Sequence, residues 1–250
     1  MKINTNEWNA YINSVKAEVS KLEGNPDQKY WKDEASYLQK ITEEAEKEAA
    51  EYSASKAAGS ANKPAEKNSF SALLLLATVK AELGIDFEES LSFLEERAAE
   101  NDVDALKNLG FLYCTGVYNY FDESKTDLMD INAKENEEKS TSYFEKAASL
   151  GSAHALDTLF NHLWIFITRT PKEAKVQPTA QDYLKAEEMG LKVIDIFENH
   201  RESCDLSGSA ISFTMKWLSD LYAYENPASP IYSPKKADYW EKRSQQDYED

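Results

Sequence analysis

The segment Lys139–Leu159, KSTSYFEKAASLGSAHALDTL, predicts the end of one helix, a turn at Gly151 and the start of the next helix. An approximate earlier copy, SLSFLEERAAENDVDALKNL, lies fifty residues before it at Ser90–Leu109. Internal copies of this kind are typical of proteins in which similar helical pairs stack in series. Large apolar residues align with large ones and alanines with alanines in the pairs Ser90/Ser140, Phe93/Tyr143, Leu94/Phe144, Ala98/Ala148, Ala105/Ala155, Leu106/Leu156 and Leu109/Leu159.

The composition fits a helical protein of one or two domains. The chain has 250 residues, and its 42% hydrophobic content is sufficient for a substantial core. It contains only eight glycines and seven prolines, most of which lie between apolar-periodic segments rather than inside them. This distribution favours many helices with short turns and leaves little room for a sheet.

The net charge of −17 restricts the classes of partner. Binding to nucleic acid or to an anionic membrane requires clustered lysine and arginine, so the sequence predicts neither partner. A strongly acidic protein would meet a basic protein faster than a neutral one would. The same acidity is also explained by the solubility of a helical surface rich in glutamate, and both interpretations remain open at this point.

The cysteines and the hydropathy indicate the compartment. Cys114 and Cys204 are far apart and belong to no CxxC motif, so they predict no disulfide framework. The first fifteen residues lack the apolar core of a signal peptide. The longest apolar run, Ala72–Ala77, is far too short to span a bilayer. We expect a soluble cytoplasmic protein.

Apolar residues recur at spacings of three and four through most of the chain, which predicts helices. About ten helices are expected in antiparallel pairs, with no convincing strand. The sequence therefore predicts an all-α fold, specifically an α/α superhelical solenoid. The expected helix-capping residues are Asn4 with Glu7, Asp86 with Glu89, Asp102, Thr179 with Asp182, Ser207 or Ser209, and Ser233.

The same periodicity predicts which side chains face the core. Leu184, Leu191 and Phe213 lie on the apolar stripes of two later helices, and Trp217 lies on the stripe with Phe213. The second helix carries a run of glutamates opposite its apolar stripe, which predicts a solvated face. These glutamates are Glu43, Glu44, Glu46, Glu48 and Glu51.

The chain divides at a linker and is interrupted by an insertion. The segment 59–67, GSANKPAEK, lacks periodicity, so we expect an N-terminal helical pair at 1–66, a candidate cap, followed by a solenoid at 67–250. Residues 117–135 break the helical rhythm inside the solenoid. This insertion is either a contact loop, which its composition favours, or a disordered segment. Its candidate contact residues are Tyr118, Tyr120, Phe121, Asp122, Glu123 and Asp127.

Three stretches resemble the Sel-like repeat family, relatives of the tetratricopeptide repeats whose unit is two antiparallel helices. The resemblance covers about residues 90–160 and 210–243, and the first 66 residues show none of it. It implies a solenoid in which small residues allow close helix packing and aromatic residues fill the gaps. The matching residues are Ala105, Leu109, Gly110, Leu112, Tyr113, Gly116 and Val117, then Tyr143, Phe144, Lys146, Ala147, Ala148, Gly151 and Ala155, and finally Leu218, Leu221, Tyr222, Ala237, Tyr239, Trp240 and Lys242.

The resemblance also implies where a partner would bind. In such repeats the first helix of each pair lines a concave surface, and positions off its apolar stripe would contact the partner. Phe111 and Trp164 have a second interpretation, because they would also serve as core between repeats. The candidate partner-binding residues are Asn108, Phe111, Thr115, Thr158, Asn161, Trp164, Asp220 and Tyr224.

The sequence carries no catalytic signature of the metalloprotease, serine hydrolase or phosphate-loop type. His154 and His162 lie eight residues apart on one predicted helix, but capping or surface roles are favoured over a metal site. Asp122, Asp127 and Asp130 lie in a segment without the order of an EF-hand loop. We therefore predict no catalytic residue, no metal and no cofactor.

Three function hypotheses remain. The first is a non-enzymatic protein-binding solenoid, most specifically a cytoplasmic inhibitor or immunity-type protein that neutralises a basic toxin or effector. The alternative is a scaffold or regulatory adaptor that binds a peptide or protein in a signalling pathway. The third, an enzyme on a helical scaffold, would need a bound metal or a deep pocket that holds His154 and His162 together.

Overall fold

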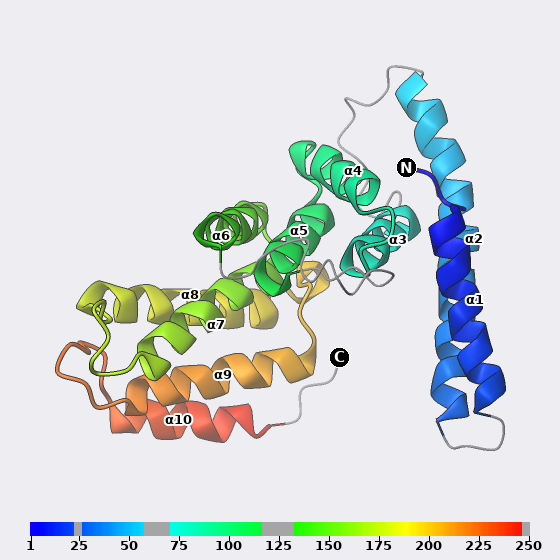
Figure 1. Ribbon diagram of the computed structural model, residues 1–250. Coiled ribbons are helices and arrows are strands. Elements are labelled where there is room, and N and C mark those ends of the chain that lie inside the picture. The colour runs from blue at the N-terminus through cyan, green and yellow to red at the C-terminus, as the bar shows by residue number, and fades with distance from the viewer. Residues whose placement is uncertain (23–26, 58–70, 117–132, 247–250) are drawn as a thin grey trace. The chain divides into compact units, whose positions relative to one another are not determined.

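The computed structural model describes residues 1–22, 27–57, 71–116 and 133–246 (Figure 1). These ranges contain ten α-helices, one short 3₁₀-helix and no strand, which confirms the predicted all-α fold. The helices pack in sequence as antiparallel neighbours, an arrangement consistent with a helical repeat. They are α1 (Asn6–Lys21), α2 (Gln28–Ala57), α3 (Ser71–Glu82), α4 (Phe87–Ala99), α5 (Val103–Thr115), α6 (Lys134–Ser149), α7 (Ala153–Arg169), α8 (Ala180–Asn199), α9 (Gly208–Ala223) and α10 (Pro234–Ser244).

The chain forms two compact units, Met1–Tyr143 (unit 1) and Phe144–Asp250 (unit 2), whose boundary falls inside α6. The predicted boundary between residues 66 and 67 lies outside the described residues and stays a prediction. Most of the predicted insertion at 117–135 also lies outside the described residues and stays a prediction. The insertion residues concerned are Tyr118, Tyr120, Phe121, Asp122, Glu123 and Asp127.

The fifty-residue repeat is visible in the backbone of two inter-helix turns. Asn101, between α4 and α5, has φ 66°, and Gly151, between α6 and α7, has φ 100°, so both take the left-handed conformation that ends a helix. The next residue in each turn, Asp102 or Ser152, caps the following helix with its side chain. Each cap also donates its N–H to the carbonyl five residues back, at 3.2 Å in the first turn and 3.1 Å in the second. The two turns are therefore equivalent in structure as well as in sequence.

A fully buried lysine anchors unit 1. Lys80 of α3 donates from Nζ to the carbonyl oxygens of Lys2 (3.1 Å) and Ile3 (2.9 Å), and to Oδ2 of Asp86 (2.8 Å). The ammonium also lies 5.6 Å from the centre of the Trp8 ring. A buried charge is tolerated only when it is paired and hydrogen-bonded, and Lys80 satisfies both conditions. The N-terminal segment is thereby fixed to α3.

This network explains why Asp86 does not cap α4 as predicted. Asp86 has a left-handed backbone (φ 46°) and makes no side-chain capping bond. Its carboxylate instead accepts from Lys80 and from the Thr5 hydroxyl at 2.5 Å. The local Asp86–Glu89 spacing is typical of a cap, but a buried ammonium is a stronger partner for the carboxylate than a backbone N–H.

Two further predictions about the N-terminal pair are wrong. The residue that caps α1 is Thr5, whose hydroxyl accepts from the Trp8 N–H at 3.1 Å, and not Asn4. Glu48 does not belong to a solvated face, because its carboxylate accepts from the Leu73 N–H at 2.7 Å. That N–H lies in the first turn of α3 and has no partner within its own helix, so Glu48 of α2 satisfies it.

Unit 2 packs α7, α8, α9 and α10 around a core that includes Phe160, Tyr183, Leu218 and Tyr222. Gly190 lets α8 approach this core closely, because a Cβ there would lie 2.9 Å from Leu218 Cδ2 and 3.0 Å from Phe160 Cζ. The predicted capping residues Thr179 with Asp182, Ser207 and Ser233 are confirmed.

Three core assignments in unit 2 are wrong. Leu184 and Leu191 of α8 are 43% and 39% exposed, and Phe213 of α9 is 61% exposed. Each lies beside the buried stripe of its helix, on the side that the neighbouring helices of unit 2 leave uncovered. Periodicity places these residues near the apolar face, but the width of that face is set by tertiary packing.

Candidate protein-binding surface

Three aromatic side chains form a continuous stack on α7 and α9. Trp164 comes from α7, while Phe213 and Trp217 come from α9, where a spacing of four residues places them on the same face. The rings of Trp164 and Trp217 lie 5.7 Å apart and those of Phe213 and Trp217 lie 6.3 Å apart, both with interplanar angles of 29°. We call these three residues the α7–α9 aromatic surface.

The aromatic surface packs on a buried side chain and is partly exposed to solvent. Phe160, which is fully buried, supports it with its ring 6.1 Å from that of Trp217. Phe213 is mostly exposed, whereas Trp164 and Trp217 are partly buried. The Arg169 guanidinium lies 5.4 Å from the centre of the Trp164 ring. The result is a rigid, amphipathic patch of the residue types that dominate interface energies.

One donor in this surface has no partner among the described residues. The indole Nε1 of Trp164 is shielded from solvent and makes no hydrogen bond with the described part of the chain. A buried N–H without an acceptor is unfavourable by about 1–3 kcal/mol.

A buried acid connects α7 to α9 in the same unit. Asp157 is 8% exposed and accepts from the Thr214 hydroxyl of α9 at 2.6 Å. Burial raises the pKa of Asp157 to about 6, although the hydrogen bond from Thr214 partly opposes this rise. The sequence offered no signal for this contact, because the aligned residue of the earlier copy is Lys107.

The predicted binding residues of unit 2 lie along α7 and at the end of α9. Thr158, Asn161 and Trp164 are partly buried, and the Thr158 hydroxyl donates to its own helix at the carbonyl of His154. Asp220 forms an ion pair with Lys216 at 3.2 Å, and Tyr224 is the C-terminal cap of α9. Of these residues the structure brings Trp164 against Trp217, a contact that sequence reasoning did not predict.

The predicted binding residues of unit 1 lie on α5. Asn108 donates from Nδ2 to the Thr78 hydroxyl at 2.8 Å, so it holds α5 against α3. Phe111 is partly buried, and Thr115 is exposed with its hydroxyl bonded to the carbonyl of Phe111. Asn108 thus has a structural contact that its predicted role did not include.

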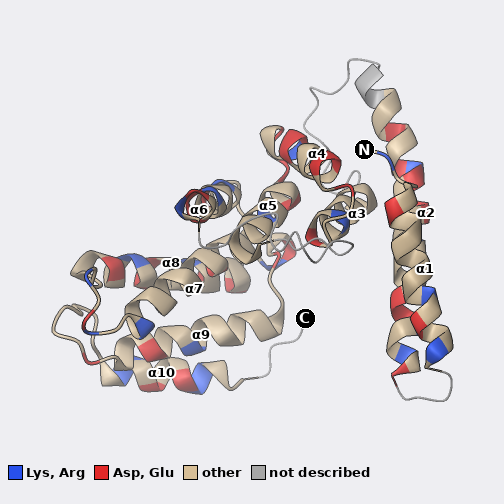
Figure 2. Cartoon of the chain, in the orientation of Figure 1, with Lys and Arg blue, Asp and Glu red and all other residues tan. Residues whose placement is uncertain are grey.

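Figure 2 shows acidic and basic residues on the helices of both units, and the sequence distributes them unequally between the units. The sequence of unit 1 contains 28 acidic and 16 basic residues, and that of unit 2 contains 17 and 12. On α9, Lys216 forms ion pairs with both Asp220 and Glu241, the latter at 2.5 Å. The excess acidity therefore belongs mainly to unit 1.

The described residues contain no group of three His, Cys, Asp or Glu side chains suited to hold a metal ion. His154 donates its backbone N–H to Asp205 Oδ1 at 2.9 Å, and the His162 ring lies edge-on to Phe144 at 6.1 Å. None of the helices in the described ranges has both the length and the apolar character required to cross a bilayer.

Comparison with known proteins identifies no relative: no family model, curated protein or solved structure matches the chain. The observations therefore support an all-helical protein of ten consecutively packed helices, counted over the described ranges, without assignment to a family.

Proposed function

We propose that this chain is a non-enzymatic protein-binding helical repeat protein of the Sel-like type. More specifically, it is a cytoplasmic inhibitor or immunity-type protein that neutralises a basic toxin or effector. The observation that carries the proposal is the α7–α9 aromatic surface, in which two tryptophans and a phenylalanine stack on two helices of unit 2.

The aromatic surface supplies the short-range part of binding. Tryptophan and arginine are enriched among the residues that dominate protein interfaces, and Trp164, Trp217 and Arg169 lie together here. Their aromatic rings are held in place by packing, so little side-chain entropy is lost on association. Phe213 would bury most of its ring only when a partner covers it.

The net negative charge of the chain supplies the long-range part of binding. A net charge of −17 attracts a basic protein and raises its rate of encounter, and salt screens this attraction. The proposal therefore requires that the affinity for the partner falls as the salt concentration rises.

The experiment is capture of the partner from the native host, followed by titration of the purified pair across salt concentrations. We expect a basic protein that binds wild type and binds Phe213→Ala much more weakly. Tyr232→Ala is the matched control, because Tyr232 is also an exposed aromatic residue of unit 2 but lies outside the aromatic surface. Equal binding by wild type and Phe213→Ala would contradict the proposal.

A peptide-binding adaptor is the alternative, and the exposed stack of rings favours it as much as it favours a folded partner. The adaptor and the inhibitor are distinguished by whether the ligand is a short peptide or a folded protein. A short peptide from the partner should bind with the full affinity if the chain is an adaptor. A folded inhibitor target should need its intact surface, since stable complexes of folded proteins bury about 1,200–2,000 Å². Deletion of residues 118–134 in the same assay tests whether the predicted insertion contributes.

A further inference from the structure

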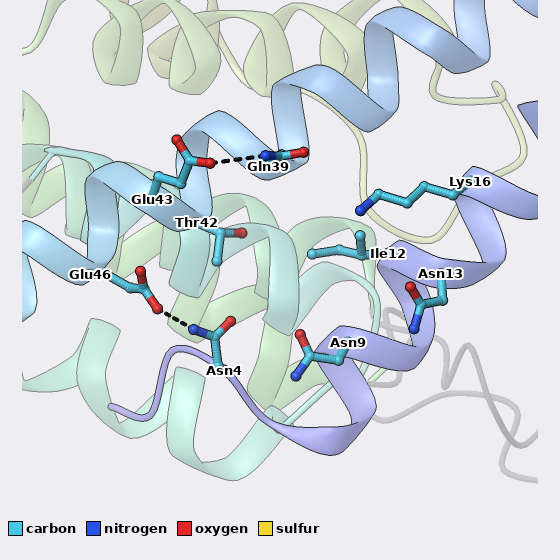
Figure 3. Close-up of a pocket in the computed structure, with 9 residues that line it drawn as sticks. All are labelled: Asn4, Asn9, Ile12, Asn13, Lys16, Gln39, Thr42, Glu43 and Glu46. Atoms are coloured by element: carbon cyan, nitrogen blue, oxygen red, sulfur yellow. Dashed lines mark hydrogen bonds between the residues drawn. The ribbon is translucent and has the colours of Figure 1, made fainter.

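A polar groove lies between α1 and α2 in unit 1 (Figure 3). It has a volume of about 280 Å³, and its floor includes Ile12 and Thr42, both of which are buried. The Thr42 hydroxyl accepts from Trp8 Nε1 at 3.0 Å and donates to the Leu38 carbonyl at 2.7 Å, so the floor is fixed by hydrogen bonds. We call this feature the α1–α2 groove.

The two walls of the groove carry polar side chains at the same spacing. Asn9, Asn13 and Lys16 lie on α1, and three residues with the same offsets of four and then three lie on α2. These are Gln39, Glu43 and Glu46. Such offsets place all three members of a set on one helix face, so each wall is a continuous polar strip.

The α1 wall is unoccupied by internal contacts. The side chains of Asn9, Asn13 and Lys16 make no hydrogen bond or ion pair with the residues that the structure describes. On the α2 wall, Gln39 donates to Glu43 at 2.9 Å, and Asn4 donates to Glu46. Two asparagine amides and one ammonium therefore remain available to a ligand, together with the second oxygens of both carboxylates.

The two ends of the groove carry opposite charges. Figure 3 shows Glu46 with Asn4 at one end and Lys16 at the other. Because the helix rises about 1.5 Å per residue, Gln39 and Glu46 lie roughly 10 Å apart along α2. Three residues of extended chain span the same length, at about 3.3 Å each. Asparagine amides both donate and accept, so they match the N–H and C=O groups of such a chain.

We infer that the α1–α2 groove binds a short extended peptide whose basic side chain faces Glu43 and Glu46 and whose C-terminal carboxylate faces Lys16. This inference goes beyond the proposed function, since it concerns unit 1 and does not involve the aromatic surface. The peptide-binding inference and the protein-binding proposal are therefore independent, so a negative result for one does not contradict the other.

The test uses the full chain and the peptide N-acetyl-Lys-Ala-Ala with a free carboxylate. Nuclear magnetic resonance should show saturable shifts of the side-chain amides of Asn9, Asn13 and Gln39 at millimolar peptide. Two matched peptides remove one charge each: norleucine replaces lysine in the first, and a C-terminal amide replaces the carboxylate in the second. Each should bind about fivefold more weakly, which is the size of effect expected from one exposed ion pair.

Variants then assign each charge to its end of the groove. Glu43→Gln with Glu46→Gln should abolish the preference for lysine over norleucine, and Lys16→Met should abolish the preference for the free carboxylate. Glu44→Gln is the control, because Glu44 is an exposed glutamate of α2 that does not line the groove. Equal shifts with all three peptides, or no saturable shift with the first, would overturn the inference.

Discussion

Units 1 and 2 are built in the same way but present different chemistry. Both stack antiparallel helices, and both contain the turn that repeats at a distance of fifty residues. The sequence of unit 1 has twelve more acidic than basic residues, and its structure fixes the N-terminal segment with the buried Lys80. The sequence of unit 2 has an excess of five acidic residues, and its structure carries the α7–α9 aromatic surface.

Under the proposed function, this difference divides two tasks between units of the same architecture. Helix-to-helix packing uses the small and apolar positions of the repeat, so the remaining surface positions are free to vary. In unit 1 these positions carry most of the net negative charge, which under the proposed function attracts a basic partner over distance. In unit 2 they carry the three rings of the aromatic surface, which under the same proposal act on contact. The predictions below test this division, beginning with the largest expected effect.

Lys80→Met should destabilise the protein by about 3–5 kcal/mol, because it leaves the carboxylate of Asp86 without its buried cation. Urea unfolding followed by circular dichroism measures the loss. The double variant Lys80→Met/Asp86→Asn should recover part of it, since the uncompensated charge is removed. Lys40→Met is the control and should change stability by less than about 0.5 kcal/mol, because Lys40 is exposed. A similar loss in both single variants would contradict the role given to Lys80.

Asp157→Asn should stabilise the protein at pH 7 by about 2–3 kcal/mol. The folded pKa of Asp157, about 6, lies above the ordinary value of 3.8, so the folded state binds more protons than the unfolded state between these values. Asp157 therefore favours folding most below pH 4, and this contribution is lost as the pH rises to about 6. The amide keeps an oxygen that accepts from Thr214, so the hydrogen bond is preserved.

Unfolding measured from pH 4 to pH 7 tests this prediction. Wild type should lose stability relative to Asp157→Asn over this interval, and the two curves should converge toward pH 4. Parallel curves would show that Asp157 does not titrate as its burial predicts.

Phe213→Ala and Trp164→Ala should each weaken partner binding by about 2 kcal/mol, or roughly thirtyfold. Phe213 is mostly exposed, so its removal should leave the unfolding transition nearly unchanged. Trp164 packs on Trp217 and should cost some stability as well. Isothermal titration with the captured partner separates binding from folding. Loss of binding only in proportion to loss of folded protein would remove the aromatic surface from the interface.

Ser152→Ala should produce the smallest effect, about 1–2 kcal/mol of stability, because it removes one helix cap and the hydrogen bond that the Ser152 hydroxyl donates to Asp205 Oδ2 at 2.7 Å. The equivalent variant Asp102→Ala should cost more, since Asp102 also binds the buried Arg97 at 2.7 Å. Asp102→Ser should keep the cap without the ion pair, so its loss of stability should lie between those of Ser152→Ala and Asp102→Ala. Equal losses for Ser152→Ala and Asp102→Ala would show that the Asp102–Arg97 ion pair contributes no more than the Ser152–Asp205 hydrogen bond.

The sequence predicts local features of this fold well. The caps at Asp102, Thr179, Ser207 and Ser233 depend on residues within three positions of each other, and all four are confirmed. Asp86 has an equally good local pattern but fails, because its partners Lys80 and Thr5 are set by tertiary packing. Helix position and capping could therefore be predicted from the sequence, whereas competition from distant groups could not.

The candidate surface was accessible to sequence reasoning only in part. The register of the repeat predicts Trp164 as a binding residue, but periodicity predicts Phe213 in the core and places Trp217 with it on the apolar stripe. Their stacking depends on how α7 packs against α9, and neither helix alone carries a signal for that contact. The sequence does not predict the buried contact of Asp157 for the same reason, since its partner Thr214 lies on the other helix.

The measurement that tests the central claim most directly is the dissociation constant of the captured partner across salt concentrations for three proteins. These are wild type, Phe213→Ala, and a charge variant in which Glu44, Glu51 and Glu137 of unit 1 become glutamine. We predict that Phe213→Ala weakens binding equally at every salt concentration, and that the charge variant reduces the salt dependence with its largest effect at low salt. Affinity that is independent of salt, or wild-type binding by Phe213→Ala, would contradict the account.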